Sequence, residues 1–170
     1  FLTLQRDAVG LALFEDRIID YLPPRCRPGQ LRRIMGLLES DPKGAATNLV
    51  GPLDELTATV RRRGLVVLIS DLLAPASALQ GPLSRLHARG HEVIVLRVLD
   101  PAEVDFAFEA ASRFRDVESG RDLFIEPSSA RAGYLAKFRA HADELAGICD
   151  GMGFVLRTMT TDSPRELALF

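Results

Sequence analysis

Two apolar runs of strand length lie in the middle of the chain, on either side of a segment with helical periodicity. The runs are Leu65 to Ile69 and Glu92 to Leu99, and such runs are typical of strands buried in a parallel sheet. Between them, Ala76 to Arg89 is expected to form a helix that Gly90 closes. Its apolar positions share one face: Leu79, Leu83 and Leu86. The order strand, helix, strand predicts parallel strands joined by right-handed crossovers.

The first part of the chain predicts a β-hairpin and then a helix. Ala8 to Phe14 and Arg17 to Leu22 are extended segments separated by a short turn, which is the pattern of a hairpin. Gly29 to Ser40 follows a proline-rich stretch and has apolar residues at helical spacing. These residues are Leu31, Ile34, Leu37 and Leu38. The pattern predicts an amphipathic helix.

A second, longer helix is expected next, with Thr47 or Asn48 as its N-cap. Its expected core positions are Leu49, Leu53, Leu56 and Val60. We expect this helix to end at Arg61 to Arg63, where three positive charges would suit the negative end of the helix dipole.

The last third of the chain predicts a polar hairpin, a long helix and a final strand. Arg113 to Val117 and Asp122 to Ile125 are expected to form an inserted hairpin, and Ser128 to Asp150 a long helix. The apolar stripe of that helix is Leu135, Phe138, Ala142, Leu145 and Cys149. Two glycines precede a strand from Phe154 to Thr158, and a short helix from Pro164 to Leu169 is expected at the end.

Composition fits a single globular domain over residues 1–170. The chain has 170 residues, 47% hydrophobic and 26% charged, and no repeat or linker divides it. A net charge of -2 with a pI near 5.9 gives no general attraction to nucleic acid or anionic membranes. The chain begins at Phe1 without an initiator methionine, so we expect a fragment whose beginning is missing.

Cysteine usage and hydropathy indicate a cytoplasmic protein. The two cysteines, Cys26 and Cys149, are too few for a disulfide framework or a zinc site, which favours a reducing compartment. No apolar run approaches the roughly 20 residues that span a bilayer, so no membrane segment is expected in this chain.

The motifs of several large enzyme classes are absent. The sequence contains no GxGxxG, GxxxxGK[ST], GxSxG or HExxH, which argues against dinucleotide-binding, P-loop, hydrolase and zincin enzymes. His87 and His91 flank Gly90 near a predicted helix end, where solvated or dipole-paired histidines are commoner than metal ligands. His141 lies inside the long predicted helix and is interpreted as a surface residue.

Asp71 is the first candidate for function. It follows the apolar run Leu65 to Ile69 in the segment RRRGLVVLISDLLAP, and ligands of open α/β sheets bind beyond the carboxyl ends of strands. The structural alternative is that Asp71 caps the next helix, which Pro75 near the start of that helix would support.

Thr47 is a second oxygen donor that the same edge of the sheet could receive. It lies at a loop-to-helix junction about one helix before Asp71. Mg²⁺ prefers oxygen ligands in near-octahedral geometry and keeps several waters, so these two residues would supply only part of a site. From the residues alone, two unrelated helix caps are the commoner explanation.

Several blocks of the sequence resemble one bacterial family. They are DAVGLALFEDRIIDYLPPRCRPGQLRRIMGLLE, GAATNL, GLVVLISDLL, RGHEVIVLRVLDPAEVDF and RFRDVESG. Together they resemble the von Willebrand factor A-like half of the family catalogued as domain of unknown function number fifty-eight. The resemblance covers nearly the whole chain. It implies a three-layer, Rossmann-like α/β fold with sheet order 3-2-1-4-5-6 and helices on both faces. The first, central strand would precede residue 1, so the strands of Ala8 to Phe14 and Leu65 to Ile69 should either close on each other or leave a gap.

The resemblance also implies a metal site and a partner. In von Willebrand factor A domains a metal-ion-dependent adhesion site uses a DxSxS motif, a Thr and an Asp. Thr47 in AATNL and Asp71 in LISDLL match the Thr and Asp motifs, and the chain has no DxSxS. Members of the resembled family are often found beside MoxR-type AAA+ ATPases, with which they are thought to assemble or metallate other proteins.

The expected function is therefore a non-catalytic protein-interaction module, assisted by Mg²⁺, that acts with a MoxR-type AAA+ ATPase or its client. One alternative is an Mg²⁺-dependent hydrolase or phosphatase on the same architecture, which needs a second carboxylate near Asp71 or a nucleophile with its base. Asp100 is the only local candidate, and we interpret it as the end of its strand and the start of a proline turn. Another alternative is metal-free binding through the basic face of Arg25 to Arg33.

Overall fold

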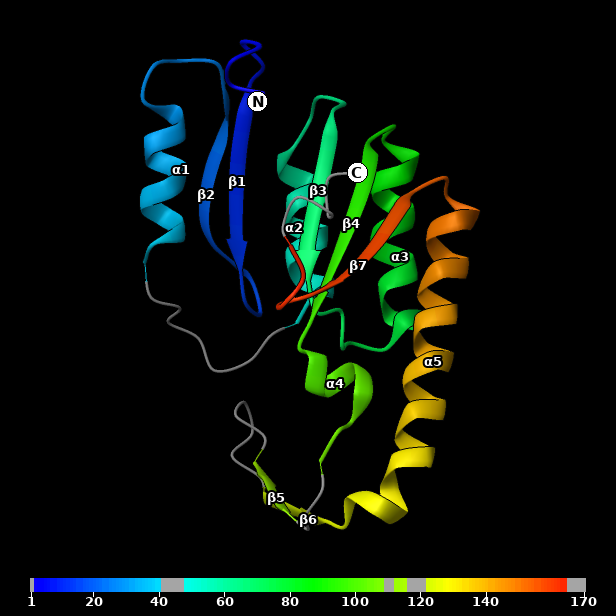
Figure 1. Cartoon of the computed structure of the whole chain (residues 1–170). Helices are drawn as coiled ribbons and strands as arrows, with labels where there is room; N and C mark the ends of the chain where they lie inside the picture. The colour runs from blue at the N-terminus through cyan, green and yellow to red at the C-terminus, as the bar shows by residue number, and fades with distance from the viewer. Residues whose placement is uncertain (1, 41–47, 109–111, 116–121, 165–170) are drawn as a thin grey trace. The chain divides into compact units, whose positions relative to one another are not determined.

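The computed structural model describes residues 2–40, 48–108, 112–115 and 122–164. The chain divides into two compact units, Phe1–Thr59 and Val60–Phe170. Each unit has its own sheet (Figure 1). That residues 1–170 form one domain stays a prediction.

The N-terminal unit begins with the predicted hairpin. β1 (Val9–Phe14) pairs antiparallel with β2 (Ile18–Arg25). β2 continues through two prolines that cannot donate to the ladder. The hairpin is tightly packed at Gly10, where an added Cβ would lie 2.7 Å from the carbonyl oxygen of Leu22. The prediction of a hairpin is confirmed, and β2 is longer than expected.

The first helix, α1 (Gln30–Leu38), is anchored by a glutamine as well as by its apolar stripe. Gln30 is 1% exposed, and its Nε2 donates to the carbonyl oxygens of Val9 at 2.8 Å and Pro23 at 3.1 Å. Of the four apolar positions predicted for this helix, only Ile34 is fully buried. Leu31 and Leu38 are more than half exposed. The helix is therefore confirmed, whereas its inward face is narrower than the sequence predicted.

The second helix, α2 (Val50–Thr59), follows a cap at Asn48. The side-chain oxygen of Asn48 accepts the backbone N–H of Val50 at 3.0 Å, so one of the two predicted capping residues takes this role. The helix ends at Thr59 and has no basic residue in its last turn. The interpretation of Arg61 to Arg63 as charges on the helix end is wrong, because these residues lie in the segment between α2 and the next strand.

The C-terminal unit contains a parallel three-stranded sheet. Its order is β3 (Leu65–Ser70), β4 (Glu92–Leu99) and β7 (Val155–Thr160). Helix α3 (Ala76–Ala88) packs on β4 and α5 (Pro127–Gly151) on β7, and the two helices contact each other (Figure 1). The predicted alternation of parallel strands and crossover helices is confirmed.

The buried side chains of this unit follow the predicted stripes closely. Those exposed by 5% or less include Leu68, Leu79, Leu83, Leu86, Val93, Val95, Leu99, Leu145, Cys149 and Phe154. Within the described residues β3 pairs only with β4, so its other edge has no strand partner, and β1 pairs only with β2. The strands of Ala8 to Phe14 and Leu65 to Ile69 thus do not pair with each other.

A short helix and a hairpin are inserted between β4 and α5. α4 (Pro101–Asp105) directly follows β4. β5 (Ser112–Arg115) and β6 (Asp122–Ile125) pair antiparallel, which confirms the predicted insertion. The expected C-terminal helix from Pro164 to Leu169 lies almost wholly outside the described residues.

Candidate functional site at the carboxyl end of β3

Asp71 follows β3 directly and is exposed, as the sequence predicted. Its neighbours form a compact local network. The Ser70 hydroxyl donates to Asp71 Oδ1 at 3.2 Å and accepts the backbone N–H of Leu72 at 3.1 Å. Because the carboxyl ends of the three parallel strands lie at the same edge of the sheet, Asp71 occupies the usual ligand-binding position of this architecture.

Asp71 is not the N-cap of α3. That helix has Pro75 at its N-cap position and no side-chain hydrogen bond there. The Asp71 carboxylate lies four residues earlier, and its other backbone contact is with the N–H of Leu73 at 3.5 Å. The alternative explanation of Asp71 as the cap of the next helix is therefore wrong.

The loop that carries Asp71 has an unusual backbone conformation. Leu72 has a φ of 54°, in the left-handed region, and its side chain is only 2% exposed. Non-glycine residues rarely adopt this conformation, and it persists where the surrounding structure imposes it. A buried leucine side chain is one such constraint on the turn.

Two side chains from other elements fix the carbonyl groups of this loop. Arg97, on β4, donates from Nε to the carbonyl oxygen of Asp71 at 3.1 Å. His141, on α5, bonds through Nε2 to the carbonyl oxygen of Leu72 at 2.8 Å. Since a carbonyl only accepts, Nε2 of His141 carries the proton. The interpretation of His141 as a plain surface residue is wrong.

Arg97 is the most deeply buried charged residue of the described chain. It is 1% exposed, and its Nη2 has no hydrogen-bond partner among the described residues. Burial lowers the pKa of Arg97 from its ordinary value, and the negative charges of Glu103 and Asp71 oppose that shift. An arginine nevertheless stays protonated in a folded protein. A full positive charge therefore lies beneath the Asp71 loop.

One aromatic ring of a stacked cluster lies against this guanidinium. Its Cζ lies 4.9 Å from the centroid of the Phe138 ring, a cation–π distance. Tyr134 stacks on Phe138 and on Phe106, with centroids 5.8 Å and 4.6 Å apart. The Tyr134 hydroxyl donates to the carbonyl oxygen of Glu103 at 2.9 Å. Burial raises the pKa of Tyr134, and the negative charge of Glu103 raises it further.

The other half of the predicted site cannot be placed beside Asp71. Thr47 lies outside the described residues, so its pairing with Asp71 stays a prediction. Within residues 2–40, 48–108, 112–115 and 122–164, no three His, Cys, Asp or Glu side chains are grouped to hold a metal ion. Asp71 can offer one carboxylate, and Mg²⁺ needs further oxygen donors beside it.

Asp100 has a structural task. Its carboxylate accepts the N–H of Ala102 at 2.8 Å, and the Glu103 carboxylate accepts the N–H of Asp100 at 2.9 Å. This reciprocal arrangement is a capping box at the start of α4. Asp100 lies between the end of β4 and Pro101, as predicted for a residue that ends its strand and begins a proline turn. Its carboxylate accepts a hydrogen bond at the start of α4.

The remaining sequence candidates are dispersed. The rings of His87 and Phe154 meet edge to face at 5.8 Å, and His91 is 4% exposed with no hydrogen-bond partner for Nδ1 among the described residues. Cys26 is exposed, whereas burial raises the pKa of the Cys149 thiol. A raised thiol pKa disfavours the reactive thiolate, so Cys149 is a core residue.

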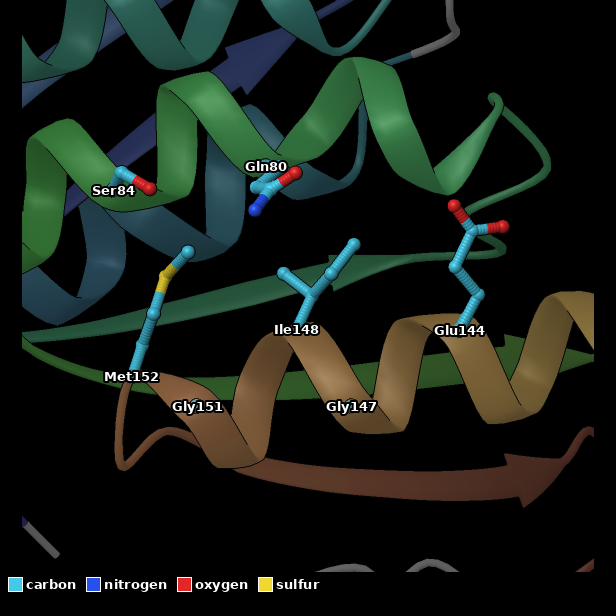
Figure 2. A pocket seen from close by; sticks show the side chains of 7 residues that line it. All are labelled: Gln80, Ser84, Glu144, Gly147, Ile148, Gly151 and Met152. Carbon is cyan, nitrogen blue, oxygen red and sulfur yellow. The ribbon is translucent and has the colours of Figure 1, made fainter.

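A shallow groove lies elsewhere, between α3 and α5 (Figure 2). Its volume is about 410 Å³. Its lining residues are Gln80, Ser84, Glu144, Gly147, Ile148, Gly151 and Met152. Ile148 and Met152 project toward α3, and Gln80 projects back toward α5.

Sequence reasoning missed Arg97 and His141. Arg97 left one visible signal, since it is the only charged residue in the otherwise apolar stretch from Val93 to Leu99. Arg97 also follows Val93 and Val95 at every second residue of β4, so the strand pattern places it on the same face as these buried valines. His141 left no comparable signal, because a histidine on a helix can face either the core or water. None of the described helices is long and apolar enough to cross a membrane.

Comparison with curated proteins finds relatives in mycobacteria. An uncharacterized protein of Mycobacterium tuberculosis (strain ATCC 25618 / H37Rv) is 33% identical over 132 residues, which cover 76% of this chain and 41% of the relative. An uncharacterized protein of Mycobacterium avium is 32% identical over 134 residues, covering 78% of each chain. This chain thus spans about two fifths of the length of the M. tuberculosis relative.

Two solved structures are similar in fold. The conserved hypothetical protein BatB from Bacteroides thetaiotaomicron superposes with a TM-score of 0.53 at 16% identity, covering 98% of this chain and 77% of that one. An aerotolerance-related membrane protein from Bacteroides fragilis NCTC 9343, with multiple mutations to serines, has a TM-score of 0.50 at 17% identity and coverages of 95% and 75%. At these identities the likeness concerns the mixed α/β fold alone.

The family model described as "Protein of unknown function DUF58" matches residues 1–144, and the mycobacterial relatives match most of the same chain. The chain belongs to the DUF58 family.

Proposed function

We propose that this DUF58 chain is a von Willebrand factor A-like module that binds another protein with the help of Mg²⁺ and does not itself catalyse a reaction. Its partner would be a MoxR-type AAA+ ATPase, or a client of that ATPase, during the assembly or maturation of other proteins in the cytoplasm. The observation that carries the proposal is the exposed Asp71 at the carboxyl end of β3, on a loop whose carbonyl groups are hydrogen-bonded by Arg97 and His141.

The von Willebrand factor A topology is part of this proposal. In this proposal the order β3-β4-β7 would correspond to strands 4-5-6 of the expected sheet. The central strand would then pair with the free edge of β3 and come from sequence before residue 1. Leu65 and Ile69 of β3 are 49% and 59% exposed, and parallel sheets are normally covered on both faces. Unpaired backbone groups in a covered sheet would cost about 1–3 kcal/mol each, so a pairing strand would stabilise this edge.

The proposed metal site is shared between this chain and other segments. Asp71 would provide one oxygen ligand, directly or through water, and Thr47 would provide a hydroxyl. The remaining oxygens would come from a DxSxS stretch before residue 1 and from an acidic side chain of the partner. Mg²⁺ would supply a hard cation that carboxylates of two proteins can share.

The test compares two carboxylate substitutions in the complete protein. Asp71→Asn removes the charge of the proposed ligand, and Asp143→Asn removes the charge of another exposed aspartate, on α5. Capture of a MoxR-type AAA+ ATPase from the same organism is measured in Mg²⁺ and in EDTA. We expect Asp71→Asn to weaken capture in Mg²⁺ by at least about tenfold, and Asp143→Asn to behave as wild type. Capture that is equal in Mg²⁺ and EDTA for all three proteins would refute the metal-assisted mechanism.

The hydrolase alternative finds no support in the described residues. It requires a second carboxylate facing the same space as Asp71, or a nucleophile with its base. Of the nearby carboxylates, Asp100 accepts the backbone N–H of Ala102 and Glu103 accepts that of Asp100, both at the start of α4.

A further inference from the structure

The carboxyl edge of the sheet carries a row of polar side chains on one face, of which Ser70 is half-buried, Arg97 is buried and Thr158 is exposed. Ser70 pairs with Arg97 across β3 and β4, and Arg97 pairs with Thr158 across β4 and β7. Directly opposed residues of a parallel sheet point to the same face. Two residues earlier, the corresponding row is Leu68, Val95 and Leu156. The sheet therefore changes from apolar to polar beside the loop that carries Asp71.

Stability alone does not account for the arginine in this row. A buried charge loses its hydration. When its N–H donors are only partly hydrogen-bonded, the remaining interactions do not offset that desolvation free energy. Arg97 is 1% exposed and has an unpartnered Nη2 among the described residues. An apolar side chain of similar length would avoid that cost. A costly buried group beside a candidate site points to a functional reason for its presence.

The contacts of Arg97 and His141 converge on one turn. They bond the carbonyl oxygens of two consecutive residues, Asp71 and Leu72, from β4 and from α5. The same turn contains the left-handed backbone of Leu72. With both carbonyl groups held, the peptide planes on either side of Leu72 cannot rotate freely, which restrains the backbone from which the Asp71 side chain extends.

We propose that Arg97 and His141 are positioning residues that hold the Asp71 loop from its buried side and keep the carboxylate in a binding-ready orientation. The inference rests on the proposed function in so far as Asp71 is the group being positioned. Preorganised support of this kind is general for metal-ligating carboxylates, and its removal typically costs about 10–100-fold in metal affinity.

The experiment uses the complete protein with four substitutions and two controls. Arg97→Met removes the guanidinium and keeps an apolar chain of similar length. His141→Ala removes the second donor, and His141→Gln supplies an amide donor at a similar reach. The controls are Arg157→Met, at an exposed position of β7, and His87→Ala, at an exposed position of α3. Asp71→Asn is included to test the function separately.

Three quantities are measured for each protein. The first is the hydrogen-exchange rate of the Leu72 amide, which donates to Ser70 Oγ within the loop. The second is the midpoint of urea unfolding, and the third is capture of a MoxR-type AAA+ ATPase from the same organism in Mg²⁺. We expect Arg97→Met and His141→Ala to speed Leu72 exchange at least about tenfold and to weaken capture about tenfold or more. Their unfolding midpoints should stay near that of wild type, and His141→Gln should restore exchange and capture.

The outcomes separate the positioning role from the proposed function. Wild-type exchange at Leu72 in both Arg97→Met and His141→Ala would overturn the positioning role. If Arg97→Met does not fold, the His141 pair decides, since a failure of His141→Gln to rescue His141→Ala also overturns it. If Arg97→Met and His141→Ala exchange faster at Leu72 but Asp71→Asn captures the ATPase as well as wild type, the proposed function is refuted. The role of Arg97 and His141 in holding the loop then remains.

Discussion

Leu72 offers a clear test of the loop geometry, because two opposing effects meet in one residue. Its side chain is 2% exposed and its φ is 54°. Truncating a buried leucine to alanine costs about 2–5 kcal/mol. A left-handed backbone costs an L-residue about 1–2 kcal/mol, and glycine avoids that cost at the expense of about 0.5–1 kcal/mol of extra freedom in the unfolded chain.

These magnitudes predict the order of two variants. Leu72→Ala loses the packing and keeps the strained backbone, whereas Leu72→Gly loses the packing and relieves the strain. Leu72→Gly should therefore be the more stable of the two by about 0.5–1 kcal/mol. At Leu79, in the middle of α3 and 1% exposed, the order should reverse, with alanine ahead of glycine by about 1 kcal/mol.

Urea unfolding of the four variants, followed by circular dichroism, measures both differences. For each site, the midpoint of the glycine variant is subtracted from that of the alanine variant. With a slope of about 2 kcal/mol per M, this difference should be about 0.8 M larger at Leu79 than at Leu72. The comparison is internally controlled, since each pair differs by a single methyl group at a buried leucine position. The same order at both sites, with alanine ahead, would refute a left-handed turn at Leu72.

Three further predictions concern other residues of the chain. Asp100→Ala removes the cap of α4 and should lower the free energy of unfolding by about 1 kcal/mol, measurable by urea unfolding; no change would show that the capping box is not formed in solution. Iodoacetamide at pH 8 should label Cys26 rapidly and Cys149 only on unfolding, because burial raises the pKa of Cys149; mass spectrometry of folded protein with equal labelling would contradict its burial. The pKa of Tyr134 is raised above its ordinary 10.0 in the folded protein, so the stabilisation by the protonated phenol is full below pH 10 and is lost as pH rises through the folded pKa. Tyr134→Phe should therefore lose less stability at alkaline pH than wild type, as measured by urea unfolding across pH. The same dependence of stability on pH in both proteins would count against a raised pKa.

Much of the C-terminal unit could be predicted from local pattern. β3 and β4 are apolar runs of strand length, and α3 and α5 carry apolar stripes that the structure buries at Leu79, Leu83 and Leu145. In these segments periodicity and burial agree, because each element buries one face against its neighbours.

The errors arise where a contact joins distant parts of the sequence. Arginines suit a helix end, so the sequence predicts one at Arg61 to Arg63; this local boundary is also wrong, because the helix ends at Thr59. The role of His141 depends on the carbonyl of Leu72, 69 residues earlier in the chain. Neither propensity nor periodicity contains such a contact, since both describe only neighbours along the sequence.

The position of Asp71 was predictable and its support was not. A carboxylate after an apolar run indicates the edge of an α/β sheet, and the structure places Asp71 there. The left-handed turn at Leu72 has no local signal, because glycine or asparagine would be the usual choice for it. The conformation depends on the burial of the Leu72 side chain and on the bonds from Arg97 and His141.

The central claim is that the Asp71 carboxylate contributes to a divalent-cation site. Titration of the complete protein with Mg²⁺ by isothermal calorimetry, in parallel with Asp71→Asn and Asp143→Asn, tests it most directly. We predict saturable binding that Asp71→Asn weakens by at least about tenfold and that Asp143→Asn leaves unchanged. The same Mg²⁺ affinity in all three proteins would contradict the account.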